Sequence, residues 1–414
     1  MIVKITPNAL SGTVSAPPSK SYAHRYIISA YLSGDKVKIK NAGVSADVQA
    51  TVSSLNAMGG DIYFDGNDVI VNGRRSVVGK VTVDAGESGS TMRFLMPVAC
   101  ALGINAEFTG KGKLMSRPIN ELATTLKSAG VEIDGHTVKG KLKAGTFEID
   151  ASVSSQYISG LLFALPLLDG DSTIILKNNA VSVSYIDITL DVLNKFGVEV
   201  KKIENGYFVK GNQKYIAINE VAVEGDYSGA AFTLSLGALG GKVTVTGLNA
   251  NSRQGDSEII SVLGNMGAKI SYNNGAYTVE KGDLNAITVD AENIPDLVQV
   301  IACVSAYAKG ETVIKNVDRL RIKESDRINA VIDTLTVAGV KSWYSNGNLH
   351  IVGGEVLGGN FDGGNDHRTV MSATVLGSYG KGDFTIKGAE AHQKSYPEFF
   401  NDFIKLGGVV DVEI

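Results

Sequence analysis

The chain contains few of the residues that build metal sites and disulfides. Its 414 residues include two cysteines, five histidines and one tryptophan. Cys100 and Cys303 both lie in apolar stretches of helical character, which favours buried free thiols and a reducing, cytoplasmic compartment. HExxH motifs and Cys/His clusters are absent from the sequence, so we expect no bound metal.

An excess of positive charge and long apolar runs are also missing. The formal net charge is −4, which gives no overall footprint for nucleic acid. No run approaches the roughly 20 apolar residues of a membrane span, and residues 1–10 lack the apolar core of a signal peptide. Walker A, Rossmann and GxSxG motifs do not occur. With 44% hydrophobic residues, the chain can bury sizeable cores.

What the sequence does contain is one pattern written six times, with a period of about 70 residues. Each copy opens with a short strand, a turn of small and polar residues, and a helix rich in Ala, Gly, Ser and Leu. The openings are residues 14–25, 83–95, 149–162, 223–234, 289–301 and 361–371. Six polar turns therefore lead into six helix N-termini, which are sites that bind anions.

The second half of each copy is equally regular. A second helix ends at a glycine suited to a left-handed cap, followed by an alternating strand and, in the full-length copies, a turn into another strand. These glycines are Gly59, Gly130, Gly197, Gly267, Gly339 and Gly407. The last copy stops after one strand, and residues 1–6 resemble the strand that it lacks.

The pattern predicts an α/β fold of two similar domains. Strands separated by helices favour parallel pairing. Several first helices are apolar on all sides, so we expect three to fill each domain, with sheets and second helices outside. We place the domains at residues 14–225 and at residues 1–13 plus 226–414. Two crossing strands, near residues 13–15 and 223–226, would form a hinge between them.

Seven cations lie at or just before helix starts. They are Lys20, Arg25, Arg117, Lys323, Arg327, Arg368 and Lys394. A cation at a helix N-terminus is unfavourable by roughly 0.3–1 kcal/mol, which a sequence tolerates where an anion binds. Hydroxyl and amide side chains suit the remaining ligand oxygens, at Ser21, Ser154, Ser155, Gln156 and Ser182. Arginine favours phosphate or carboxylate, so the set indicates a small ligand with several negative charges.

Plainer interpretations stay open for each motif taken singly. A lone Lys-x-x-x-Arg is typical of a solvated helix face. Asp366 before His367 and Arg368 is typical of an N-cap, and Ser154 to Gln156 of a capping turn. Asp296 and Glu324 are acid/base candidates, but both could be surface carboxylates paired with arginine.

Taken in order, the motifs resemble the enolpyruvyl transferase family, on the branch that acts on shikimate 3-phosphate. The resemblance is carried by PPSKSYAHR, GESGSTMR, RPI, SSQYISGLL, YIDITL, VEGDYS, IPD, KESDR, DHR and the segment around Lys394. It implies two domains of three βαβαββ repeats each, like an inverse α/β barrel, that close over a cleft. It also implies a cytoplasmic monomer that needs no cofactor or metal and transfers the enolpyruvyl group of phosphoenolpyruvate to the 5-hydroxyl of shikimate 3-phosphate.

The resemblance also implies residue roles. Asp296 is similar to the base that takes the 5-hydroxyl proton, and Glu324 and Lys20 to the groups that handle the proton at C3. The set for shikimate 3-phosphate is Lys20, Ser21, Arg25, Ser154, Ser155, Gln156, Ser182, Asp296 and Lys323. The set for phosphoenolpyruvate is Lys20, Gly89, Arg117, Gln156, Arg327, Arg368 and Lys394. Glu87, Phe94 and Arg319 depart from the family pattern, and Arg319 is left out of the binding set.

Two rival functions are weighed against this one. The sister enzyme that acts on UDP-N-acetylglucosamine shares fold and chemistry but typically has a cysteine in the loop before Arg117. Here that loop reads FTGKGKLMSRPI and contains none. A non-catalytic module that binds phosphorylated metabolites is the other rival. Asp296 and Glu324 together disfavour it, because pure anion binding has no use for two carboxylates.

Overall fold

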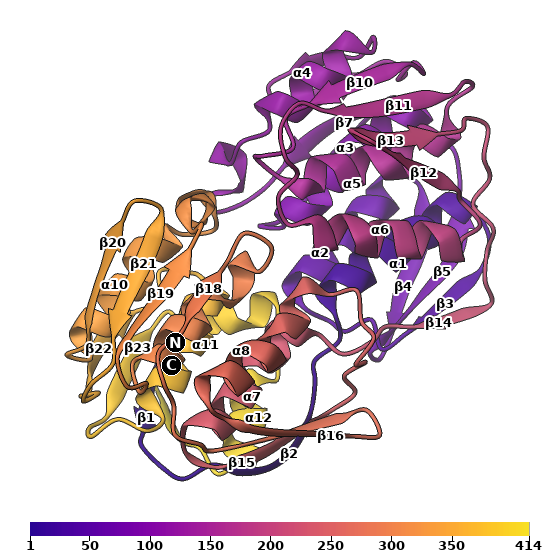
Figure 1. Ribbon diagram of the computed structural model, residues 1–414. Coiled ribbons are helices and arrows are strands. Elements are labelled where there is room, and N and C mark those ends of the chain that lie inside the picture. The colour runs from indigo at the N-terminus through magenta and orange to yellow at the C-terminus, as the bar shows by residue number, and fades with distance from the viewer. Residues whose placement is uncertain (414) are drawn as a thin grey trace. The chain divides into compact units, whose positions relative to one another are not determined.

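The computed structural model describes residues 1–413 as two compact units (Figure 1). One unit is Lys20–Val223, here called the inserted unit, and the other joins Met1–Ser19 to Glu224–Ile414, here called the terminal unit. Each has its own hydrophobic core, built entirely from its own residues. No helix among residues 1–413 combines the length and the apolar character needed to cross a bilayer.

The chain follows a repeated βαβαββ order, and its strands form six four-stranded sheets. The second repeat is β6 (Lys80–Asp84), α3 (Gly89–Leu102), β7 (Asn105–Thr109), α4 (Asn120–Ser128), β8 (Glu132–Asp134) and β9 (Thr137–Lys139). The sheet order is β6-β7-β9-β8, with the first pair parallel and the others antiparallel. The same arrangement recurs in all six sheets, which confirms the predicted α/β fold class.

The remaining elements follow the same scheme. In the inserted unit they are α1 (Lys20–Ser33), β3 (Val37–Lys40), α2 (Ala46–Ala57), β4 (Gly60–Asp65), β5 (Asp68–Arg74), η1 (Leu114–Ser116), β10 (Thr146–Ile149), α5 (Ser155–Ala164), η2 (Leu165–Leu167), β11 (Ser172–Leu176), α6 (Val183–Lys195), β12 (Val200–Ile203), β13 (Gly206–Val209) and β14 (Glu220–Ala222).

The terminal unit begins with β1 (Ile2–Thr6) and β2 (Ser11–Ser15) and resumes after the inserted unit. Its other elements are α7 (Tyr227–Gly240), β15 (Lys242–Thr246), η3 (Gly255–Glu258), α8 (Ile259–Met266), β16 (Lys269–Asn273), β17 (Ala276–Glu280), β18 (Thr288–Asp290), η4 (Pro295–Leu297), α9 (Val298–Ser305), β19 (Glu311–Lys315), η5 (Asp318–Ile322), α10 (Arg327–Val337), β20 (Lys341–Ser345), β21 (Asn348–Val352), β22 (Gly359–Asp362), α11 (His367–Gly377), β23 (Phe384–Lys387), η6 (Ala389–Lys394), α12 (Phe399–Lys405) and β24 (Val409–Glu413).

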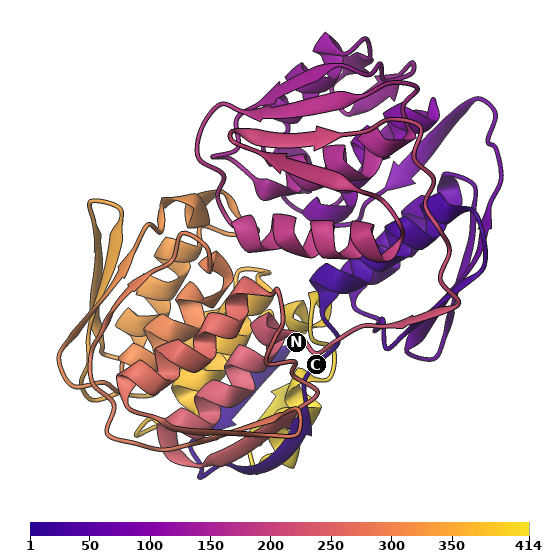
Figure 2. The same cartoon turned by 45° about the vertical axis from the view of Figure 1, so that its right-hand side comes forward.

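The first helix of each repeat is buried, as predicted from its apolar surface. In the inserted unit, α3 packs on α5, and the rings of Phe94 and Phe163 meet edge to face with centroids 5.7 Å apart. In the terminal unit, α7, α9 and α11 contact one another. Within each unit, Figure 2 shows these helices inside and the sheets outside.

The N-terminal strand completes the last repeat. β1 lies between β23 and β24 and is antiparallel to both, with Ile2 opposite Lys387 on one side and Glu413 on the other. Val3 and Ile5 are fully buried in the terminal unit. This confirms the prediction that residues 1–6 supply the strand that the sixth copy lacks.

The opening strands of the first and fourth repeats exchange sheets, which the sequence did not predict. β2 pairs in parallel with β15 of the fourth repeat, and β14 pairs in parallel with β3 of the first. The expected domain borders lie before Val14 and after Gly225, whereas the two units divide after Ser19 and after Val223. Repeat periodicity identifies a strand but does not specify the sheet that it joins.

The two chain passages between the units lie side by side within the terminal unit. Pro18 and Gly225 form an antiparallel bridge, the Ser19 N–H donates to the Glu224 carbonyl (2.8 Å), and the Gly225 N–H donates to the Gly247 carbonyl (3.0 Å). A Cβ on Gly225 would come within 2.5 Å of that Gly247 oxygen, so only glycine fits. The chain thus passes between the units at residues 19–20 and 223–224. The second passage lies where the sequence places it, whereas residues 13–15 belong to β2 inside the terminal unit.

Candidate functional site

In the inserted unit, the N-terminus of α3 lies against an arginine. Arg117 ends η1, in the turn before Pro118. A Cβ built on Gly89, the first residue of α3, would lie only 2.8 Å from Nη1 of Arg117. Gly89 is needed here because its missing side chain leaves room for the guanidinium. The structure thus brings together two residues that the family resemblance assigns to phosphoenolpyruvate.

Gln156, near the start of α5, belongs to the same cluster. Its Oε1 accepts from Nη1 of Arg93 (2.7 Å) and its Nε2 donates to Oγ of Ser90 (2.9 Å). Arg93 also donates from Nη2 to the Pro118 carbonyl (2.9 Å). The two contacts fix which side of the amide is oxygen and which is nitrogen. Sequence reasoning missed Arg93 and Ser90, although both lie in the GESGSTMR motif.

The predicted serines occupy helix starts. Ser154 is the N-cap of α5, and its Oγ accepts from the Gln156 N–H (3.3 Å), so the capping interpretation is confirmed. Ser155 is buried at the first position of that helix. Ser182 precedes α6 with a left-handed backbone (φ 53°), which is uncommon for serine and holds the residue in one conformation.

Arg25 is a buried cation with neutral partners. Its Nε donates to Oγ1 of Thr189 (2.7 Å), Nη1 to the Ser21 carbonyl (2.8 Å) and Nη2 to the Tyr185 carbonyl (2.9 Å). The guanidinium lies 4.9 Å from the centroid of the Phe94 ring. Burial lowers its pKa to about 10. Across residues 1–413 the structure pairs Arg25 with no carboxylate, so a bound anion would supply a missing counter-charge.

Lys20 forms an ion pair that the sequence did not predict. It is the first residue of α1, and its Nζ lies 2.7 Å from Oδ2 of Asp47, in the first turn of α2. One turn along α1, the ring of His24 contacts Oγ1 of Thr51 through Nδ1 (2.6 Å). Burial lowers the pKa of His24 to about 3, so this histidine is neutral.

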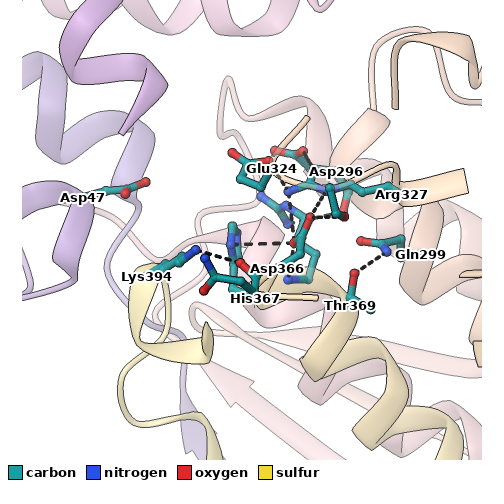
Figure 3. A network of polar contacts seen from close by, with 12 residues as sticks. Asp47, Asp296, Gln299, Glu324, Arg327, Asp366, His367, Thr369 and Lys394 are labelled. Atoms are coloured by element: carbon teal, nitrogen blue, oxygen red, sulfur yellow. Dashed lines mark hydrogen bonds and ion pairs between the residues drawn. The ribbon is translucent and has the colours of Figure 1, made fainter. Parts of the chain in front are cut away.

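In the terminal unit, Arg327 lies among three carboxylates (Figure 3). Its Nη1 is 2.9 Å from Oδ1 of Asp296, and its Nη2 is 2.8 Å from Oε2 of Glu324. Its Nε is 2.8 Å from Oδ2 of Asp366. Arg327 is 2% exposed, so little solvent screens these contacts. The structure thus joins both acid/base candidates through one guanidinium. Their pairing with arginine agrees with the plainer interpretation, and both side chains are partly exposed, at 18% for Asp296 and 23% for Glu324.

Arg368 adds a second guanidinium to this arginine–carboxylate network. Its Nη2 lies 2.8 Å from Oδ2 of Asp296, and its Nη1 donates to the Asp296 carbonyl (3.3 Å). Asp366 caps α11 by accepting from the Arg368 N–H (3.0 Å), which confirms the predicted N-cap. Lys394 donates from Nζ to the carbonyl of Asn365, next to that cap (2.7 Å).

The charges in the network act strongly on one another. Burial would raise the pKa of Asp296, but the positive charges of Arg368, Lys323 and Arg327 hold it below its usual range. Burial likewise opposes ionisation of Asp366, whose pKa is nevertheless lowered by Arg327 and His367. Both carboxylates are therefore ionised. Within residues 1–413 no group of His, Cys, Asp and Glu side chains is arranged to hold a metal ion.

One further carboxyl near this network was missed by the sequence. Asp256, in η3, is 2% exposed, and Ser228 donates a short hydrogen bond to its Oδ2. Burial and the negative charge of Asp296 raise its pKa to about 7. Arg319, left out of the predicted binding set, donates from Nη2 to the Glu292 carbonyl.

Comparison with known proteins agrees with the fold and the motifs. The family model described as EPSP synthase (3-phosphoshikimate 1-carboxyvinyltransferase) matches residues 5–403. Relatives named 3-phosphoshikimate 1-carboxyvinyltransferase are 40% identical in Clostridium kluyveri (99% of this chain, 98% of the relative) and 40% in Clostridium perfringens (99% of each).

Solved structures give the same result. An EPSP synthase from Acinetobacter baumannii superposes with a TM-score of 0.85 at 25% identity, covering all of both chains. An enolpyruvyl transferase from Streptomyces tendae has a TM-score of 0.78 at 15% identity, with 99% of this chain and 98% of the other covered, and shares the fold. With its repeats, its helix-end cations and its match along nearly the whole length, this chain belongs to the EPSP synthase family.

Proposed function

We propose that this protein transfers the enolpyruvyl group of phosphoenolpyruvate to the 5-hydroxyl of shikimate 3-phosphate, the step that leads toward chorismate and the aromatic amino acids. The observation that carries the proposal is the network in which Arg327 joins Asp296 and Glu324. It combines groups for binding an anion with groups for moving protons, in a chain that matches the family over residues 5–403.

The proposed reaction is an addition followed by an elimination. The 5-hydroxyl oxygen bonds to C2 of phosphoenolpyruvate, the hydroxyl loses its proton, and C3 gains one. The tetrahedral intermediate then breaks the bond from C2 to the phosphate oxygen. C3 gives up a proton, the double bond returns, and inorganic phosphate leaves. Each step moves protons and one leaving group, so acids, bases and cations suffice.

Three residues are proposed to move the protons. Asp296 takes the proton of the 5-hydroxyl, while Glu324 and Lys20 serve C3. The location of Asp296 and Glu324 on one guanidinium supports this assignment, because Arg327 holds both carboxylates at set distances. Lys20 is held by Asp47 in a similar way.

The other residues are proposed to bind the substrates. For shikimate 3-phosphate they are Lys20, Ser21, Arg25, Ser154, Ser155, Gln156, Ser182, Asp296 and Lys323. For phosphoenolpyruvate they are Lys20, Gly89, Arg117, Gln156, Arg327, Arg368 and Lys394. The buried guanidinium of Arg25, whose described partners are neutral, supports a phosphate contact there. The close approach of Arg117 to Gly89 supports a second anion contact at the start of α3.

We further propose that two domains of three repeats each close over the substrates and that the protein acts as a monomer in the cytoplasm. The side-by-side passages at Pro18 and Gly225 suit a hinge. Cys100 and Cys303 are buried free thiols, as expected in a reducing compartment. Light scattering during size-exclusion chromatography measures the oligomeric state.

The decisive assay follows phosphate release with shikimate 3-phosphate and phosphoenolpyruvate together. We expect turnover with this pair, and none when UDP-N-acetylglucosamine replaces shikimate 3-phosphate. The opposite result would assign the chain to the sister activity, and no release with either acceptor would support a binding module. Lys323→Ala should weaken shikimate 3-phosphate binding by about 1.5–3 kcal/mol, because it removes a charge-assisted contact. Calorimetry measures that change.

A further inference from the structure

The carboxylate of Asp296 bridges two arginines of the terminal unit, Arg327 and Arg368. Figure 3 shows Asp296 beside Arg327. Oδ1 lies 2.9 Å from Nη1 of Arg327, and Oδ2 lies 2.8 Å from Nη2 of Arg368. Each oxygen therefore engages a different guanidinium. A ligand carboxylate shared between two arginines would use the same two donors in the same way.

Asp366, the fully buried carboxylate of the network, is held differently from Asp296. Asp366 is fully buried, accepts from Nε and Nη2 of Arg327 and from Ser325, and caps α11. Moving it would disrupt a helix start as well as an ion pair. Asp296 is 18% exposed at its side chain and lies in the short η4 turn. Of these two carboxylates, Asp296 is therefore the one that can withdraw while the arginines stay in place.

The network holds no excess of positive charge for an incoming anion. Arg327 and Arg368 face the carboxylates of Asp296, Glu324 and Asp366, which leaves the set one negative charge in excess. Lys323, whose charge also acts on Asp296, brings it to neutrality. A neutral set attracts a polyanion only weakly. When Asp296 gives up its two contacts, Nη1 of Arg327 and Nη2 of Arg368 can turn to phosphoenolpyruvate, while Arg327 keeps its contacts with Glu324 and Asp366.

We infer that Asp296 occupies the place of the phosphoenolpyruvate carboxylate, and that the arriving ligand displaces it from Arg327 and Arg368. This inference rests on the proposed function, which makes both arginines part of the phosphoenolpyruvate site. It gives Asp296 two successive positions: an internal ligand of the arginines before binding, and a released carboxylate afterwards.

Displacement also prepares Asp296 to act as a base. While it bridges the arginines, their charges stabilise the ionised form and oppose proton uptake. Once the ligand carboxylate compensates the charges of the two arginines, they stabilise the ionised form of Asp296 less, and its affinity for a proton increases. The base thus becomes effective only when phosphoenolpyruvate is in place, which couples occupancy of the site to the first proton transfer.

The test measures binding of phosphoenolpyruvate alone to the full-length protein by calorimetry. Asp296→Ala should bind it about tenfold more tightly than the wild type does, because the internal competitor is gone, even though turnover is lost. Asp290→Asn is the matched control. It removes one negative charge from β18, a few residues away, and keeps the Oδ1 that accepts from Asn316 and from the Glu292 N–H. We expect its affinity to stay within about twofold of the wild type.

Two further measurements make the result specific. Asp296→Asn is the second variant, in case the alanine variant folds poorly. It keeps the shape of the side chain, so we expect a smaller gain in affinity for phosphoenolpyruvate. Inorganic phosphate lacks a carboxylate, so its affinity should rise less than that of phosphoenolpyruvate. Equal or weaker binding of phosphoenolpyruvate by both variants, or an equal gain for both anions, overturns the inference. Wild-type turnover with shikimate 3-phosphate tests the proposed function separately, because it does not depend on the ranking of these affinities.

Discussion

Arg327 depends on Asp366 for its orientation. The carboxylate of Asp366 accepts from Nε (2.8 Å) and Nη2 (3.3 Å), so it holds one edge of the guanidinium while the opposite edge points toward Asp296. Both Arg327 and Asp366 are almost completely buried. Loss of Asp366 would leave the buried charge of Arg327 less well compensated, because only the more exposed Asp296 and Glu324 would still contact it.

Asp366→Ala should therefore lower the free energy of unfolding by about 3–5 kcal/mol, through the broken ion pair and the lost α11 cap. Ser325→Ala serves as its control, since it removes one hydrogen bond to the same carboxylate (2.9 Å) and should cost no more than about 1 kcal/mol. Denaturant titration monitored by circular dichroism measures both. Equal losses in the two variants would argue that the charge of Asp366 is unimportant for stability.

His24 makes the stability of the inserted unit depend on pH. Its pKa is about 3 in the folded protein because the ring is buried, against an ordinary value of 6.5. Between these values the unfolded chain binds a proton that the folded protein does not, so stability falls as pH drops from 6.5 toward 3. His24→Asn removes this term. Relative to the wild type, the free energy of unfolding of the variant should rise by up to about 3 kcal/mol as the pH falls from 7 to 4.

A control for the histidine prediction is Thr51→Val, which removes the hydroxyl beside Nδ1 but leaves the ring in place. Its effect on unfolding should change little with pH. A constant difference between wild type and His24→Asn over the same range would show that His24 titrates normally.

At the residue scale, the sequence identified the groups but not their partners. The cap at Asp366 and the cap at Ser154 follow from local spacing, and both are confirmed. The pairing of Lys20 with Asp47 and of Gln156 with Arg93 joins different helices. Such contacts depend on tertiary packing, which a single sequence does not specify. The assigned substrate contacts stay predictions.

At the scale of helices, the inserted unit depends on a close crossing of α3 and α5. A Cβ on Gly160 would lie 2.4 Å from the Arg93 carbonyl oxygen and 3.1 Å from Cγ of Pro97. Gly160→Ala should push the two helices apart and destabilise the protein by about 1–3 kcal/mol. It should also disturb the orientation of Arg93 and hence of Gln156.

The matched substitution is Gly264→Ala in α8, where the new methyl would meet only Cδ1 of Ile270 at an ordinary 3.6 Å. Gly264 is exposed, and its replacement should raise the free energy of unfolding by about 0.5–1 kcal/mol, because alanine restricts the unfolded chain and favours the helix. In thermal unfolding, we expect Gly160→Ala to lower the melting temperature and Gly264→Ala to raise it. A loss at Gly264 as large as that at Gly160 would contradict the close-contact explanation.

The sequence predicted the helices and hairpins better than it predicted the strand partners. Apolar composition identified the buried first helices, and the Gly-capped second helices lead into antiparallel hairpins as expected. The exchange of β2 and β14 was missed because both strands have the same pattern and precede similar helices. A periodic signal cannot distinguish two equivalent sheets.

At the scale of the whole molecule, the inserted unit interrupts the terminal one. Residues 20–223 are continuous and have a core of their own. The flanking residues Ser19 and Glu224 are joined by a 2.8 Å hydrogen bond, so a short linker can connect them. We predict that residues 20–223 fold alone, and that residues 1–19 joined to 224–414 by a Gly-Ser linker fold as well. Each should unfold cooperatively on heating, and a broad, featureless transition in either would contradict this.

The position of β1 has a consequence for folding during synthesis on the ribosome. The inserted unit has all of its residues once Val223 has emerged, whereas β1 must wait for β23 and β24, which end the chain. At roughly 5–20 residues per second that wait lasts about 20–80 s. Throughout it, Val3 and Ile5, both destined for a core, stay exposed on the nascent chain. We therefore expect chaperones to bind the first few residues during synthesis rather than the last.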